Sequence, residues 1–225
     1  MTRVGVTSDR FDVVAAGYAD AGLEPVALPC IRIQPAPSRD ITHVRERAIR
    51  ADLLMITSPR VVSLVWPDGR MPDVDTAVVG RSTASRVERA GGRVTQVGNA
   101  GLARLVELTA DQMEGRCVMI AHAEGSDPAA MARLREIAPD LEEHPVYRAV
   151  PVAPGADRVD AVAFASPSAV NGWGLSRSFD DLVVGAIGAT TAAAIARHRV
   201  ADVIADRPSH SNLARAIASF MEVNV

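Results

Sequence analysis

The chain lacks lysine altogether, because all 24 of its basic residues are arginine. Schiff-base aldolases, pyridoxal-phosphate enzymes and Walker-type phosphate-binding loops all need a lysine amine. The composition therefore excludes these three classes of function, whatever the cause of the bias.

Cysteine and histidine are too few and too scattered to suggest a metal site or disulfides. The 2 cysteines, Cys30 and Cys117, lie far apart, and the 5 histidines form neither an HExxH motif nor a close pair at ligand spacing. This pattern excludes a disulfide framework and a zinc knuckle. We therefore expect no structural metal.

Long apolar runs are also missing. No stretch approaches the roughly 20 apolar residues that a membrane-spanning helix needs, and the start MTRVGVTSDRFD does not resemble a signal peptide. The formal net charge of −3 gives no general attraction to nucleic acid or to membranes. We expect a cytoplasmic protein that binds neither.

What the 225 residues do contain is an alternation of short apolar runs with alanine-rich stretches of helical spacing. Continuous apolar strands separated by helices indicate parallel sheets that are covered by helices on both faces. Strands are predicted at 3–7, 25–28, 53–57, 76–79, 93–97, 117–121, 161–165, 182–187 and 203–205. Helices are predicted at 11–21, 41–51, 82–90, 102–113, 128–137, 190–198 and 212–221.

The sequence also repeats itself. ADLLMITSPRVV at 51–62 resembles VDAVAFASPSAV at 159–170, and VVGRSTASRVERA at 78–90 resembles AIGATTAAAIARH at 186–198. The displacement along the sequence is the same for both pairs, from 51 to 159 and from 78 to 186, which predicts an internal duplication. Each copy has a Ser-Pro turn and a Gly-x-x-Thr-Ala turn at a point where a predicted strand is followed by a helix.

These turns place hydroxyl groups at the predicted starts of helices. Taken singly, each hydroxyl is explained as a helix cap. Taken together, the turns present free N–H groups and positive helix-dipole ends at the carboxyl edge of a sheet, where carboxylates or phosphates bind. Both interpretations apply to Ser58, Ser82, Thr83, Ser166, Thr190 and Thr191.

Two extended, proline-flanked stretches, 27–37 and 144–154, alternate apolar and polar residues as a two-stranded ribbon does. If they pair, the chain enters a second domain through one stretch and returns through the other. We therefore predict a discontinuous first domain, 1–33 plus 153–225, a second domain, 38–143, and a two-stranded β-ladder that acts as a hinge.

Taken in order, these segments resemble the uroporphyrinogen-III synthase family. No single segment is specific, whereas the ordered set with its duplicated turns is quite specific. The matching segments run in family order across nearly the whole chain: ALPCIRIQP, MITSPRVV, VVGRSTASRVERAGG, PVYRAVP, AFASPSAV, AIGATTAAAIA and SNLARAIASF.

The resemblance implies two doubly wound, flavodoxin-like α/β domains joined by the β-ladder, with the active site in the cleft between them. It also implies the reaction: linear hydroxymethylbilane loses its hydroxyl, ring D is inverted through a spiro intermediate, and the macrocycle closes to uroporphyrinogen III. It implies no metal or organic cofactor. The partner is this octacarboxylate substrate; we expect a monomer, and direct transfer from the preceding enzyme of the pathway is left open.

The family's functional positions carry over to several residues. Tyr147 in PVYRAV matches the family's candidate proton donor, although it could instead pack the hinge. Ser58 and Arg60 match a substrate-facing turn, although Arg60 could instead be a solvated surface residue. Thr83 matches the Gly-x-x-Thr turn of the same domain. The corresponding turns of the first domain, in which backbone N–H groups matter more than hydroxyls, hold Ser166, Ser168, Thr190 and Thr191.

Two turns depart from the family pattern. The family usually has Thr-Arg-Pro after the first strand, whereas this chain has Thr7-Ser8-Asp9-Arg10, so that Arg10 comes late. Where the family commonly has Arg-Gly after the strand at 117–121, this chain has His122, which either takes over anion binding or is a loop residue. Both changes reduce the positive charge expected at the cleft.

An enzyme is the leading interpretation. One alternative is a non-catalytic, tetrapyrrole-binding regulatory domain on the same scaffold, which the lack of a basic DNA-recognition helix disfavours. Another is a two-lobed sugar or amino-acid binding protein, which the Ser-Pro duplication and the missing export signal disfavour.

Overall fold

The computed structural model describes residues 1–224 and divides the chain into two compact units. Unit 1 consists of Met1–Ile33 and Ala149–Val225, and unit 2 consists of Gln34–Arg148. The chain therefore leaves unit 1 once and returns to it once. For comparison, the division predicted from the sequence is 1–33 plus 153–225 and 38–143.

Unit 1 is built on a parallel sheet with the strand order β11-β10-β9-β1-β2. Side chains of α1 (Phe11–Ala19) and α9 (His210–Asn224) pack on one face of this sheet, and those of α7 (Pro167–Trp173) and α8 (Ala189–Ile195) pack on the other. The strands are β1 (Arg3–Val6), β2 (Glu24–Ala27), β9 (Ala161–Phe164), β10 (Val183–Ala186) and β11 (Val203–Ile204).

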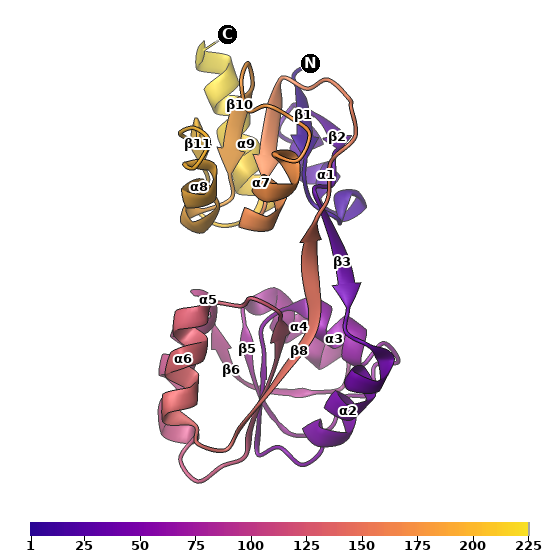
Figure 1. The fold of residues 1–225 in the computed structure, drawn as a ribbon, viewed down its shortest axis with the longest axis vertical. Coiled ribbons are helices and arrows are strands. Elements are labelled where there is room, and N and C mark those ends of the chain that lie inside the picture. Colours follow the sequence, from indigo (N-terminus) through magenta and orange to yellow (C-terminus); the bar gives the residue numbers. More distant parts are fainter. Residues whose placement is uncertain (225) are drawn as a thin grey trace. The chain divides into compact units, whose positions relative to one another are not determined.

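Unit 2 is built on a sheet with the order β3-β8-β7-β4-β5-β6, in which β8 to β6 are parallel. One face packs against α2 (Ser38–Ala48), α3 (Pro59–Val65) and α4 (Arg81–Arg89). The other face packs against α5 (Gly101–Thr109) and α6 (Pro128–Ile137), so that α2 and α6 lie on opposite sides (Figure 1). The strands are β3 (Ile31–Pro35), β4 (Leu53–Ile56), β5 (Asp75–Val79), β6 (Arg93–Gly98), β7 (Val118–Ala123) and β8 (Leu141–Pro151).

The central strand of unit 2, β4, shows why these sheets form. Its four residues, Leu53–Ile56, are all fully buried. Leu54 and Ile56 join the core beneath α2, α3 and α4, whereas Leu53 and Met55 join the core beneath α5 and α6. A strand that is apolar on both faces is stable only where helices cover both sides of its sheet. The predicted α/β class with parallel sheets is confirmed.

The topology of one unit repeats in the other. The order β6-β5-β4-β7-β8 in unit 2 corresponds to β11-β10-β9-β1-β2 in unit 1. The pair Leu53 and Asp75 of β4 and β5 corresponds to the pair Ala161 and Val183 of β9 and β10. Helices α3 and α7 begin with the same displacement along the sequence as these strands. This repetition is consistent with an internal duplication.

The two connecting strands, β3 and β8, are neighbours, and the boundary between the units falls within each of them. The predicted stretch 27–37 is interrupted, because Ala27 ends β2 and β3 begins only at Ile31. Pro29 lies between them and has no N–H group to donate to a ladder. The stretch predicted at 144–154 begins earlier, at Leu141, because the first part of β8 pairs in parallel with β7.

A glycine allows the close backbone contact that anchors α7 within unit 1. A Cβ atom on Gly172 would overlap the carbonyl oxygen of Cys30 and would lie 2.8 Å from the carbonyl oxygen of Val152. Real Cβ atoms essentially never approach this closely. Only glycine therefore lets α7 pack directly on these two segments.

We expect Gly172→Ala to lower the free energy of unfolding by about 3 kcal/mol, because backbone must move to admit the methyl group. Gly174→Ala is the matched control, since its Cβ would meet no atom closer than 3.7 Å, and it should change the free energy by less than about 1 kcal/mol. Urea unfolding followed by circular dichroism measures both variants. Equal stability of the two would contradict this packing.

Candidate functional site

The candidate residues of unit 2 lie where strands end and helices begin. After β4 ends at Ile56, Ser58 adopts an extended conformation (φ −157°, ψ 155°) and Pro59 opens α3. Proline suits this first helical position because its missing N–H would have no partner there. Gly80, with a φ of 78°, makes the corresponding turn between β5 and α4. Since the strands are parallel, both turns lie at the carboxyl edge of the sheet.

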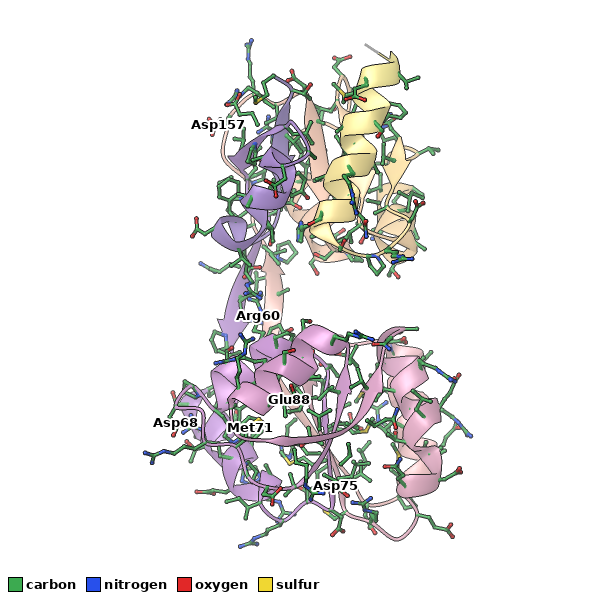
Figure 2. All side chains as sticks on the ribbon, turned by 180° about the vertical axis from the view of Figure 1, so that it is seen from behind. Arg60, Asp68, Met71, Asp75, Glu88 and Asp157 are labelled. Atoms are coloured by element: carbon green, nitrogen blue, oxygen red, sulfur yellow. The ribbon has the colours of Figure 1, made fainter. Side chains whose placement is uncertain are left out.

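Three of the predicted site residues come together at this edge. The hydroxyl oxygens of Ser58 and Tyr147 are hydrogen-bonded at 3.1 Å. The guanidinium carbon of Arg60 lies 5.5 Å from the centroid of the Tyr147 ring, which is within cation–π range. All three side chains are half-buried. Arg60 lies toward the end of unit 2 opposite Asp75, the first residue of β5 (Figure 2).

An extra residue in β8 aims Tyr147 at this cluster. His122 of β7 is opposite Pro145, but the next pair is Ala123 with Tyr147, so that Val146 is the extra residue of a β-bulge. In a regular strand, Val146 and Tyr147 would face opposite sides of the sheet. Here both pack on the core beneath α2, α3 and α4. The bulge therefore turns the Tyr147 side chain toward the face that carries α3.

A pocket of about 300 Å³ lies beside Tyr147. Among its lining residues, Asp40 and Glu124 carry negative charge, and Arg148 carries positive charge while its Nε donates to Gln34 at 3.0 Å. This volume is at the small end for ligand pockets and suits one part of a large ligand. Sequence reasoning missed these charged residues: only the position of Arg148 next to Tyr147 was a local signal, because the fold brings Asp40 and Glu124 from distant segments.

The turn between β5 and α4 offers less than its sequence suggested. The buried hydroxyl of Thr83 donates a hydrogen bond to the carbonyl oxygen of Val79 at 2.6 Å. Its proton is therefore used in a bond within the protein. Ser82 is exposed in the first turn of α4. A ligand at this turn would therefore meet backbone N–H groups and Ser82 rather than the Thr83 hydroxyl.

His122 is not brought to Tyr147. It belongs to β7 rather than to a loop, which corrects that interpretation of the sequence. By strand alternation it shares the face of Ile120, which packs beneath α5 and α6. The residue is 7% exposed, its Nδ1 lies 2.8 Å from the Ala123 carbonyl oxygen, and its buried Nε2 has no hydrogen-bond partner within residues 1–224. Anion binding by His122 stays a prediction.

In unit 1 the corresponding residues follow β1, β9 and β10. The Ser166 hydroxyl accepts a hydrogen bond from the Ala169 N–H at 3.2 Å and so caps α7. Arg10 is exposed just before α1, and its backbone N–H donates to the Ser8 hydroxyl at 3.1 Å. The first turns of α7 and α8 hold a half-buried Ser168, an exposed Thr190 and a buried Thr191.

The described residues offer no metal-binding cluster, disulfide or membrane-spanning helix. Within residues 1–224, no group of three or more histidine, cysteine, aspartate or glutamate side chains could hold a metal ion. Cys30 and Cys117 are both free thiols. No helix in the described part of the chain is long and apolar enough to cross a membrane.

Burial changes the protonation of three histidines. It lowers the pKa of His122, His144 and His210 below the ordinary 6.5, because a buried imidazolium loses hydration. Near His144, a hydrogen bond from Arg47 lowers the pKa of Glu142 below 4.5. The histidine and carboxylate effects therefore act in separate pH ranges.

We expect the free energy of unfolding to fall as the pH is lowered from 7.5 to 5. At pH values between the lowered pKa values of these histidines and 6.5, the unfolded chain binds more protons than the folded one. For each extra proton bound by the unfolded chain, the free energy of unfolding falls by about 1.4 kcal/mol per pH unit as the pH is lowered. The Glu142 contribution is lost only below 4.5. Urea unfolding at several pH values measures the slope, which His144→Gln and His210→Gln should each reduce. A stability that is flat from 7.5 to 5 would contradict the burial of these rings.

Comparisons with known proteins agree with this fold. Residues 12–215 match the family model for uroporphyrinogen-III synthase HemD. None of the curated proteins matches the chain. The uroporphyrinogen-III synthetase of Helicobacter pylori has a similar structure, with a TM-score of 0.71, 16% identity and an alignment covering 97% of this chain and 100% of that one.

A mutant uroporphyrinogen III synthase of Thermus thermophilus is also similar, with a TM-score of 0.62, 15% identity and an alignment covering 99% of this chain and 100% of that one. At such low identity, these two likenesses show the fold alone. The family model, in contrast, spans most of the sequence. The chain belongs to the uroporphyrinogen-III synthase family.

Proposed function

We propose that this protein catalyses the reaction of its family, in which linear hydroxymethylbilane closes to uroporphyrinogen III with inversion of ring D and loss of water. The observation that carries the proposal is the placement of Tyr147. In a chain that matches the family over residues 12–215, this phenol lies next to Ser58 and Arg60, at the carboxyl edge of a parallel sheet and beside a pocket.

Tyr147 serves as the proton donor. The electron-rich pyrrole expels the hydroxyl group, the C–O bond breaks with its electron pair on oxygen, and the Tyr147 proton converts the leaving oxygen to water. The pyrrole carbon that forms the final bond loses a proton when it regains aromaticity. That proton can return to the tyrosine oxygen, so that the enzyme ends in the state in which it began.

Each unit contributes anion receptors for the eight substrate carboxylates. The helix starts at the carboxyl edges present backbone N–H groups, and Arg60 and Arg10 add positive charge. The substrate-binding set comprises Arg10, Ser58, Arg60, Ser82, Thr83, His122, Ser166, Ser168, Thr190 and Thr191. Thr83 and Ser58 act on the substrate through their backbone N–H groups, because the Thr83 hydroxyl is bonded to Val79 and the Ser58 hydroxyl to Tyr147.

The remaining control is geometric. The type III product needs the substituted α-carbon of ring D, rather than the unsubstituted α-carbon on the other side of the nitrogen, to attack the reactive methylene first, and a rigid enclosure selects that attack. The pocket of about 300 Å³ beside Tyr147 has room for an uncharged part of the substrate, such as a pyrrole nucleus, because Asp40 and Glu124 in its lining would repel a carboxylate. On this proposal the protein works as a cytoplasmic monomer, and direct transfer of the unstable substrate from the preceding enzyme is left open.

The function is tested by supplying hydroxymethylbilane to the purified protein, oxidising the products and separating the type I and type III porphyrin isomers. The proposal predicts type III as the main product. Type I alone, formed at the uncatalysed rate, would contradict it. A porphyrin bound tightly without turnover would instead favour a regulatory domain on the same scaffold.

We expect Tyr147→Phe to lower the rate of type III formation by about 100-fold or more, because it removes the general acid. The chain's other tyrosine supplies the control: Tyr18 is buried in unit 1, and its hydroxyl lies 3.1 Å from His210 Nδ1. Tyr18→Phe should lower the stability while keeping the rate. If the two variants had the same rate, Tyr147 would have only a packing role.

A further inference from the structure

The two duplicated Ser-Pro turns use their serines differently. In unit 1, the Ser166 hydroxyl caps α7 by accepting from the Ala169 N–H at 3.2 Å. In unit 2, Ser58 has the same extended backbone before a proline, but its side chain makes no capping hydrogen bond to α3. It contacts the Tyr147 hydroxyl at 3.1 Å instead. The same kind of turn therefore uses its serine as a helix cap in unit 1 and as a contact with the tyrosine in unit 2.

The residues around the two turns also differ, and those of the unit 2 turn contact the tyrosine. Two residues after Ser58 the chain has Arg60, whose guanidinium lies over the Tyr147 ring at 5.5 Å. At the matching position of the other copy it has Ser168. The β-bulge at Val146 then supplies the tyrosine to the unit 2 turn. Ser58, Arg60 and the β-bulge in β8 therefore all act on the position of the Tyr147 side chain.

We propose that Ser58 is the positioning residue of Tyr147: its hydroxyl donates to the phenol oxygen and leaves the phenol proton free for the leaving group. This inference rests on the proposed function. If Tyr147 donated to Ser58 instead, its proton would be engaged within the protein and would have to be released before transfer. With Ser58 as donor, the same hydrogen bond strengthens as the phenol oxygen becomes negative.

Arg60 completes the arrangement. Its positive charge near the ring stabilises the negative charge that remains on Tyr147 after proton transfer. Because the guanidinium covers one face of the ring, it also restricts rotation of the side chain. Ser58 sets the direction of the proton, and Arg60 limits where the ring can lie.

The kinetic test uses Ser58→Ala, with Ser63→Ala as the matched control. Ser63 lies on the same helix, and its hydroxyl bonds to the Pro59 carbonyl oxygen and to Arg86 rather than to Tyr147. Ser58→Ala should lower kcat for type III formation by about 10- to 100-fold, the worth of a hydrogen bond to a charged group. KM should change much less. Ser58→Thr, which keeps a hydroxyl, should recover most of kcat, and Ser63→Ala should match the parent protein.

Stability measurements separate positioning from capping. Ser166→Ala should lower the unfolding midpoint because it removes a helix cap. Ser58→Ala should leave the midpoint close to that of the parent, because Ser58 caps nothing in α3. If Ser58→Ala lowered kcat and also lowered the unfolding midpoint as much as Ser166→Ala does, the serine would have a structural role, and the inference would be overturned.

A spectroscopic readout does not depend on turnover. Protein labelled with ¹³C at the tyrosine ring carbon that bears oxygen gives two signals, since the chain has 2 tyrosines, and Tyr147→Phe assigns them. Ser58→Ala should shift the Tyr147 signal, and Ser63→Ala should not. An unshifted signal would overturn the inference even if the parent makes type III product. If the parent makes only type I, the proposed function fails, and the shift still reports on the contact.

Discussion

The register of three adjacent parallel strands, β4, β7 and β8, is the constraint on which the candidate site depends. Leu53 pairs with Val118, which pairs in turn with Leu141, and the apolar side chains of β4 are buried on both faces. A slip of one residue would move every side chain of a strand to the opposite face, so that the cores on both sides hold this register. With the register fixed, the end of β4 and the bulge of β8 bring Ser58 to Tyr147.

The two units share one topology but surround their Ser-Pro turns differently. Strand order, register and the first Ser-Pro helix repeat between the units with a constant displacement along the sequence. The unit 1 turn keeps its serine as a cap, whereas the unit 2 turn has an arginine and a tyrosine beside its serine. The surroundings of the proposed proton donor, Tyr147, are therefore repeated only in part in unit 1, where the serine is a helix cap.

Much of this could be predicted from the sequence, because it depends on local signals. The apolar strands, the Ser-Pro and Gly turns and the constant displacement predicted the parallel sheets and the position of Ser58. The aim of Tyr147 could not be predicted, since strict alternation along β8 would place Val146 and Tyr147 on opposite faces, and the extra residue is visible only against β7. The burial of His122 and the contribution of Asp40 to the pocket likewise depend on packing between distant segments.

The most direct test of the account is a double-mutant cycle between the two hydroxyls, measured on kcat for type III formation. If Ser58 acts through Tyr147, Ser58→Ala slows the parent protein but changes the rate of Tyr147→Phe by less than about twofold, because the group that it positions is already gone. The same loss of rate in both backgrounds would show that the serine acts independently of the tyrosine, and would contradict the account.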